Sequence, residues 1–281
     1  MKLSCLPVSF FQSIVDGQMP LEEWLAFASE IGLDGTECSL GFVEPIGRLS
    51  GAKVRRLCDR AGVAVSMVTC HPDYTHPDPA ERARQVEDMG RNLRLAVELG
   101  APLARVLSGQ RHPGVSDDDG IAWAADGLLR TAEIGDRLGV RLALENHTKS
   151  FFWQHFDFAQ QSRVFLRILD RLRESSIGVN FDSANPLVAD EDPLALFERV
   201  KDRLAILHVA DTAQRGEFKF CRIGRGIAPI GEILRRTRAL GYDGWVSIEE
   251  ASRTGPDGFR EAVRFVRRAW DEAAPGRPLS S

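Results

Sequence analysis

The sequence predicts an α/β protein of the (β/α)8 barrel class, folded as a single domain. Short apolar strands alternate with amphipathic helices, many helices are followed by glycine, and the pattern recurs about every thirty to forty residues. About eight such units fit a chain of 281 residues, which matches the number of units and the usual length of this barrel. A doubly wound open sheet is the alternative, but a glycine-rich dinucleotide turn is absent after the first predicted strand.

The predicted strands are short apolar runs bounded by polar or turn-forming residues. Parallel strands buried on both faces have this composition because helices cover the sheet. In chain order, we expect strands over residues 3–8, 35–38, 63–69, 103–107, 141–145, 177–182, 204–209 and 245–249.

The predicted helices have clear signals at several ends. Asp78-Pro79 and Asp192-Pro193 each supply a capping side chain and a first-turn proline. Glycine suits the left-handed position after a helix, and we expect it there at Gly32, Gly62, Gly100, Gly139 and Gly241. The expected helices cover residues 20–31, 48–61, 80–99, 117–138, 158–172, 193–200, 230–240 and 259–269. The barrel is expected to span residues 1–270, and residues 271–281 a C-terminal tail.

The composition excludes several classes of protein. The net charge of −4 and the pI near 5.9 give no electrostatic reason to expect a nucleic-acid partner. No apolar run approaches the length of a membrane span, so we expect no membrane partner. The five cysteines lack paired spacing, which favours reduced thiols and a cytoplasmic protein.

In each of the last four predicted strands, the apolar run ends at a residue that can bind a metal ion: Glu145, Asp182, His208 and Glu249. In a barrel, these ends gather at the face that carries the active site. Three carboxylates and an imidazole suit one divalent ion, such as Mn²⁺, Mg²⁺, Co²⁺ or Zn²⁺. Any one of these side chains alone would be explained as a cap or an ion pair, but four consecutive strands favour a metal site. Glu250 points to the opposite side from Glu249, and we favour Glu249 because it ends the apolar run.

Six further polar residues follow predicted strands and are candidate substrate contacts: His71, Gln110, Arg111, His147, Asn185 and Arg222. For His71, Gln110 and Arg111 the alternative is a structural role in their loops. For His147 the alternatives are to orient the neighbouring Glu145 or to be an ordinary hydrogen-bonded core histidine. The Gly224-Arg225-Gly226 segment fits either a phosphate cradle or an ordinary turn. The aromatic segment 151–158 would either cover a sugar ring or form a subunit interface, which would allow a homo-oligomer.

These residues make the chain similar to the sugar phosphate isomerase/epimerase superfamily, the xylose isomerase-like TIM barrels. The resemblance covers nearly the whole chain. It implies that Glu145, Asp182, His208 and Glu249 bind one divalent metal ion and that the two glutamates also act as acid and base. Many relatives have histidine where this chain has Asn185. The matching segments are 144–147, 180–186, 208–211, 223–226 and 241–249.

The function expected from this resemblance is that of a metal-dependent isomerase or epimerase of carbohydrate metabolism. It would act on a sugar or keto-sugar, by proton transfer next to a carbonyl through an enediolate. A lyase or dehydratase on the same metal site is the alternative, because an enediolate can also expel a neighbouring substituent. A nuclease like endonuclease IV is disfavoured by the acidic balance and by only 6 histidines. A binding barrel without catalysis is the remaining alternative.

Overall fold

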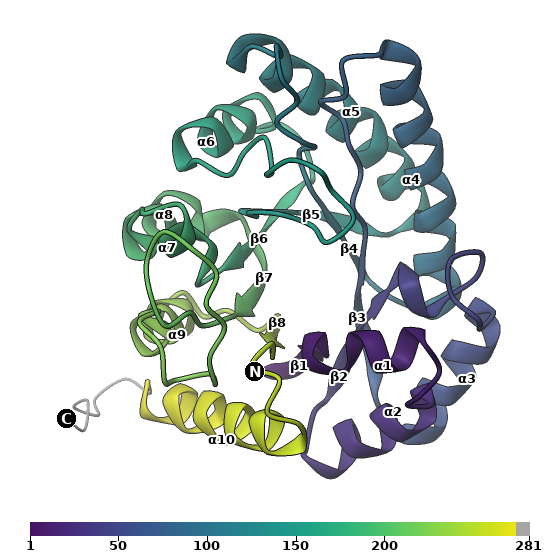
Figure 1. Cartoon of the computed structure of the whole chain (residues 1–281), viewed down its shortest axis with the longest axis vertical. Coiled ribbons are helices and arrows are strands. Elements are labelled where there is room, and N and C mark those ends of the chain that lie inside the picture. Colours follow the sequence, from purple (N-terminus) through teal and green to yellow (C-terminus); the bar gives the residue numbers. More distant parts are fainter. Residues whose placement is uncertain (274–281) are drawn as a thin grey trace. The chain divides into compact units, whose positions relative to one another are not determined.

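The eight predicted strands are all present in the computed structural model, which describes residues 1–273. They are parallel and form one sheet in the order β1-β8-β7-β6-β5-β4-β3-β2 (Figure 1). This is the strand order of a TIM barrel, so the predicted fold class is confirmed. The strands are β1 (Lys2–Leu6), β2 (Gly35–Ser39), β3 (Ala64–Thr69), β4 (Leu103–Val106), β5 (Arg141–Glu145), β6 (Gly178–Asp182), β7 (Leu204–Val209) and β8 (Trp245–Glu249).

Helices occupy the connections between the strands. The α-helices are α1 (Phe11–Val15), α2 (Leu21–Glu30), α3 (Gly51–Ala61), α4 (Pro79–Leu99), α5 (Asp117–Leu138), α6 (Ser162–Arg171), α7 (Asn185–Val188), α8 (Pro193–Val200), α9 (Ile230–Ala239) and α10 (Pro256–Glu272). Short 3-10 helices cover Val8–Phe10, Leu40–Phe42 and Lys201–Arg203. No helix within residues 1–273 is both long and apolar enough to cross a membrane.

The described chain divides into two compact units. The first comprises Met1–Glu37, Leu57–Ala64 and the described chain from Phe181. The second comprises Cys38–Arg56 and Val65–Asn180. Strand β6 continues from the second unit into the first, since the border falls between its third and fourth residues.

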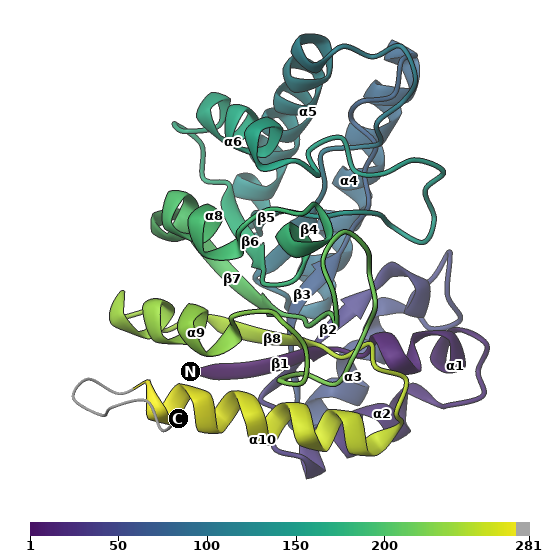
Figure 2. The same cartoon turned by 60° about the vertical axis from the view of Figure 1, so that its left-hand side comes forward.

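In the first unit, β8 pairs with both β1 and β7. The register places Leu6 beside Glu249 and His208 beside Ser247, so two of the predicted metal ligands lie on adjacent strands. Helix α10 packs beside α9 (Figure 2). Its Phe259 ring contacts Trp24 of α2 at a centroid distance of 5.2 Å, which joins both ends of the chain in one core.

In the second unit, β4 pairs with β3 and β5, and β5 pairs with β6. Helices α4 and α5 lie side by side (Figure 1). The buried Tyr74 donates or accepts a 2.7 Å hydrogen bond with Thr131 of α5. Its ring lies against Gly127, where a Cβ atom would come within 2.3 Å. The glycine therefore lets the ring pack directly on the helix backbone.

The predicted helix signals are confirmed. The Asp78 and Asp192 side chains accept hydrogen bonds from the N–H groups two residues later, each with proline at the first helical position. All five predicted glycines have a positive φ, between 67° and 81°. These positions are the ones that only glycine occupies without strain.

Some predicted boundaries are wrong. The first strand ends at Leu6, because Pro7 precedes a 3-10 helix. Helix α6 begins at Ser162 rather than at residue 158, because Asp157 accepts a hydrogen bond from the Ala159 N–H and fixes a turn. Helix α10 covers Pro256–Glu272 rather than residues 259–269. Most of the predicted tail, residues 274–281, lies outside the described residues, so the tail stays a prediction. Helices α1 and α7 were not predicted because they are too short to show a helical period.

Candidate metal centre

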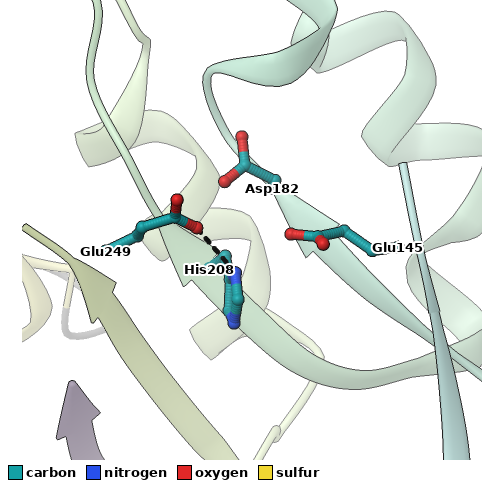
Figure 3. A group of neighbouring side chains, drawn as sticks. All are labelled: Glu145, Asp182, His208 and Glu249. Carbon is teal, nitrogen blue, oxygen red and sulfur yellow. Dashed lines mark ion pairs between the residues drawn. The ribbon is translucent and has the colours of Figure 1, made fainter. Parts of the chain in front are cut away.

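Four side chains at strand ends form one group: Glu145, Asp182, His208 and Glu249 (Figure 3). Each offers one possible ligand atom, and these atoms all lie within 4.8 Å of one another. The predicted residues are therefore brought together, while their role as metal ligands stays a prediction.

Asp182 is held by the chain that follows it. One carboxylate oxygen, Oδ1, accepts hydrogen bonds from the N–H groups of Ala184 at 2.8 Å and Asn185 at 2.7 Å. The bonds satisfy N–H groups at the start of α7 and fix the carboxylate direction. The side chain is 1% exposed, so its orientation is set by the protein and not by solvent.

His208 is buried between two carboxylates of the first unit. Its Nε2–H donates a 2.8 Å hydrogen bond to Glu37 Oε1. Its Nδ1 lies 3.2 Å from Glu249 Oε2, the ion pair drawn in Figure 3. Glu37 also accepts a hydrogen bond from Ser247. Because Nε2 carries the hydrogen donated to Glu37, Nδ1 is the nitrogen with the free lone pair. This lone pair faces the other three clustered residues.

Glu145 is paired with the buried Arg105 of β4. The guanidinium Nη1 lies 3.1 Å from Glu145 Oε2. Its Nη2 donates to His71 Nε2 at 2.5 Å. Burial, and next the Arg105 charge, hold the pKa of His71 well below its usual value. The His71 ring is therefore neutral near pH 7 and carries its proton on Nδ1.

The choice between Glu249 and Glu250 is resolved by their surroundings. Glu249 joins the group of four. Glu250 is fully buried elsewhere, and its Oε1 accepts hydrogen bonds from the Ser252 N–H and hydroxyl. Strand alternation thus sends the two carboxylates to different sides, as predicted.

The half-buried His147 and the buried Asp157 form a second pair, in the loop after β5. His147 Nδ1 lies 3.6 Å from Asp157 Oδ2. Asp157 Oδ1 accepts hydrogen bonds from Ser108 at 2.5 Å and from the Ala159 N–H at 2.8 Å. Burial raises the pKa of Asp157. The pair fixes the loop that follows β5, and substrate contact by His147 stays a prediction.

Gln110 and Arg111 hold their own loop together. The Gln110 amide donates to Asp73 at 2.9 Å and accepts from the N–H of Gln154 at 2.8 Å. Arg111 pairs with Asp117 at 2.9 Å and donates to the Phe158 carbonyl at 2.6 Å. Both side chains therefore have structural partners, and their predicted substrate contacts are untested.

Asn185 and Arg222 occupy different settings. Asn185 is buried at the start of α7, and its backbone bonds to Asp182. Arg222 pairs with Glu261 of α10 at 2.7 Å. Near Arg222, the N–H groups of Gly224 and Gly226 both donate to the Asp211 carboxylate at 2.9 Å. Asp211 therefore occupies the N–H groups that a phosphate cradle would need, while the substrate roles of Asn185 and Arg222 stay predictions.

Sequence reasoning missed the two charged residues that support the ligands, Glu37 and Arg105. Both lie inside buried strands: Glu37 is the central residue of β2, and Arg105 is the third residue of β4. A charged residue in a buried strand is rare unless it is paired. The location of these two charges inside strands was therefore a signal from which their role could have been predicted.

The donor set fits a divalent cation. Three carboxylates converge on one imidazole nitrogen, and without a cation their charges would repel. Oxygen and nitrogen donors without a thiolate suit Mn²⁺, Mg²⁺, Co²⁺ or Zn²⁺. The described residues contain no other group of this kind.

Comparisons with known proteins agree with this architecture. The model of the family described as xylose isomerase-like TIM barrel matches residues 25–269. A 3-dehydroshikimate dehydratase of Pseudomonas putida is 25% identical over 252 residues, covering 86% of this chain and 37% of that protein. A fructoselysine 3-epimerase of Escherichia coli O157:H7 is 22% identical over 241 residues, covering 83% of this chain and 86% of that protein. The chain thus matches little more than a third of the dehydratase.

Among solved structures, an L-ribulose 3-epimerase superposes with a TM-score of 0.79 at 17% identity. The match covers 98% of this chain and 99% of that one. At this identity the likeness establishes the fold alone.

Proposed function

Since this chain belongs to the xylose isomerase-like TIM barrel family and is an enzyme, we propose that it is a metal-dependent isomerase or epimerase. It moves a proton at the carbon next to the carbonyl of a sugar or keto-sugar. The relatives named as epimerases support a small carbohydrate substrate. The observation that carries the proposal is the group of four side chains at the strand ends.

Glu145, Asp182, His208 and Glu249 would hold one divalent ion. When bound, the ion supplies positive charge that polarises neighbouring carbonyl and hydroxyl oxygens and stabilises an enediolate. Its identity among Mn²⁺, Mg²⁺, Co²⁺ and Zn²⁺ is left to metal analysis. Glu37 supports this arrangement because its hydrogen bond fixes the His208 ring.

The two glutamates are the proposed acid and base. One of Glu145 and Glu249 takes the proton from the carbon next to the carbonyl, and the other returns a proton. Return to the opposite face of the same carbon gives an epimer. Return to the former carbonyl carbon, with a proton passing from the neighbouring hydroxyl to the former carbonyl oxygen, gives an isomer. Arg105 lies 3.1 Å from Glu145 and holds this carboxylate in place.

A lyase or dehydratase is the second candidate, favoured by the dehydratase that shares 25% identity with this chain. The first step is the same, because a carboxylate removes a proton next to a carbonyl. The difference is that the intermediate then expels a neighbouring hydroxyl group, which leaves as water after protonation. The fate of that hydroxyl group distinguishes the two candidates.

Solvent exchange in D₂O tests the proposal. Metal-loaded protein is incubated with a panel of keto-sugars and keto-polyols, and products are followed by NMR and mass spectrometry. We expect deuterium at the carbon next to the carbonyl, or loss of water for a dehydratase. Chelator and Glu145→Gln should each abolish both signals.

A matched control is Glu250→Gln, which alters a buried carboxylate outside the group of four. It should keep the exchange activity if it folds. Full turnover by Glu145→Gln would remove the acid/base assignment, and full turnover after complete metal removal would refute the metal dependence.

A further inference from the structure

We propose that a cavity beside His71 binds an apolar, ring-sized group attached to the sugar substrate. The inference rests on the proposed function, and it adds a substrate class: sugars that carry a planar apolar substituent, such as an aryl glycoside. The cavity has a volume of about 720 Å³ and lies within the second unit.

The cavity wall is mainly apolar and comes from three segments. The segment after β2 contributes Leu40, Pro45 and Ile46, and α4 contributes Met89 and Leu95. The loop after β5 contributes two aromatic rings, Phe152 and Trp153. Met89 and Trp153 are buried and form the inner wall, while Ile46 and Phe152 are about 65% and 64% exposed at the rim. An apolar ligand would shield these exposed side chains from water.

The cavity is connected to one candidate catalytic residue through side-chain contacts. His71 lines it, and Arg105 donates a hydrogen bond to the His71 ring. The same guanidinium pairs with Glu145, the proposed acid or base. Only Arg105 therefore separates a cavity-lining residue from a proposed catalytic carboxylate. The Phe152 ring meets the His71 ring edge-on at 5.6 Å, which carries the apolar wall up to this point.

The size of the cavity argues for a substrate larger than a simple sugar. Ligand cavities of roughly 300–1,000 Å³ hold molecules of drug size. The cavity alone falls in that range, and none of the four clustered side chains lines it. The attached group is thus the natural occupant.

The charge of the lining argues against a phosphate or another ionised group as occupant. Glu44, Arg91, Arg94 and Glu98 are exposed at the rim, where water solvates them. The half-buried Asp88 is already paired with Arg84 and Arg91. The inner wall offers apolar and aromatic surface, which matches the face of an aromatic ring.

The test compares two probes that share the sugar and differ in the attached group: methyl and phenyl β-D-glucopyranoside. Binding to the metal-loaded protein is measured by NMR titration. Burying the phenyl ring predicts about tenfold tighter binding than for the methyl glycoside. Phe152→Ala should remove most of this preference, and Met89→Trp should remove it by filling the cavity.

Phe156→Ala is the matched control, because Phe156 is an exposed ring of the same loop that does not line the cavity. It should keep the preference for the phenyl glycoside. Equal binding of the two probes by wild-type protein, or equal loss in Phe152→Ala and Phe156→Ala, overturns the inference. So does a wild-type dimer that Phe152→Ala turns into monomers without any phenyl preference, since a second copy would then be the occupant.

The outcome is separable from that of the proposed function. Keto-sugar exchange in D₂O without a phenyl preference would refute the cavity inference alone. A phenyl preference that Phe152→Ala removes, without exchange on any keto-sugar, would refute the proposed reaction alone.

Discussion

Individual residues of the candidate site are held by charged partners that lie inside strands. His208 is fixed by Glu37, and Glu145 is fixed by Arg105. A buried charge is costly unless it is paired. We therefore infer that Glu37 and Arg105 serve to pair with and orient the site residues, not only to fill space. The proposed ligands are thus oriented before a metal ion binds.

Glu37→Gln should weaken metal binding. The glutamine amide oxygen can still accept a hydrogen bond from the His208 Nε2–H. It lacks the negative charge that makes His208 Nδ1 a more basic metal ligand. We expect the affinity for the preferred divalent ion to fall by about tenfold to a hundredfold. Isothermal titration calorimetry on metal-free protein measures this directly, without any assay of activity.

The matched variant for this prediction is Glu250→Gln, which makes the same change at a buried carboxylate outside the group of four. It should leave metal affinity near that of the wild type. If Glu37→Gln binds metal as tightly as the wild type does, Glu37 does not orient His208.

The sequence predicted the four clustered residues because they share one rule: each ends an apolar strand. Glu37 and Arg105 escaped that rule because they lie within their strands. Their importance depends on which side chains face them across the fold, as in the pairing of Glu37 with His208, 171 positions away. Distances of this kind follow from strand register and tilt, which local patterns do not encode.

Among the elements, helix ends were predictable where capping chemistry is local, as at Asp78 and Gly100. The start of α6 was not predictable, because residues far away in the sequence fix the preceding turn. Phe158 bonds through its N–H to the carbonyl of Gly109, and Asp157 bonds to Ser108. Tertiary contacts thus overrode the helical pattern of residues 158–161.

Gly127→Ala should destabilise the protein, although alanine favours helices by about 1 kcal/mol over glycine. The added Cβ would lie 2.3 Å from the Tyr74 ring, so α5 or the ring must move. We expect a net loss of about 1–3 kcal/mol in the free energy of unfolding, measured with urea. Gly90→Ala in α4 is the control, because the nearest atom to its added Cβ, on the Ile134 side chain, would lie 3.6 Å away, at ordinary contact. Stabilisation by both changes would contradict the packing argument.

Glu232 in the first turn of α9 should make a pH-dependent contribution to the free energy of unfolding. Its hydrogen bond with Arg235, assisted by Arg236, lowers its pKa from 4.5 to about 2. The stabilisation should be complete above pH 4.5 and should disappear as the pH falls through about 2. Glu232→Gln should therefore cost about 1 kcal/mol or less near pH 7, and progressively less on acidification.

Urea unfolding of both proteins at several pH values between neutrality and pH 3 tests this prediction. Glu133→Gln is the comparison, because Glu133 is an exposed helical glutamate without an ion pair among the described residues. A Glu232→Gln effect that grows on acidification would have the wrong sign and would refute the assignment.

At the scale of the whole molecule, the fold gathers at one place the charged ends of strands that are far apart in sequence. In the proposed function this arrangement would hold a metal ion. We expect it to make the metal-free protein less stable, since the carboxylates repel one another. A ligand that binds only the folded state stabilises it, by about 2.7 kcal/mol at a hundredfold excess over its Kd. Metal binding and folding are therefore expected to be coupled.

Asp182→Asn should separate these two effects. The amide oxygen can still accept the N–H groups of Ala184 and Asn185, while one negative charge leaves the group of four. In chelator, we expect the variant to melt at a higher temperature than wild-type protein, because the repulsion is smaller. With excess divalent metal the order should reverse, because only the wild type gains the full binding energy. Thermal unfolding by circular dichroism, with and without metal, measures both. A variant that melts below the wild type in chelator would mean that the carboxylates do not strain the metal-free fold.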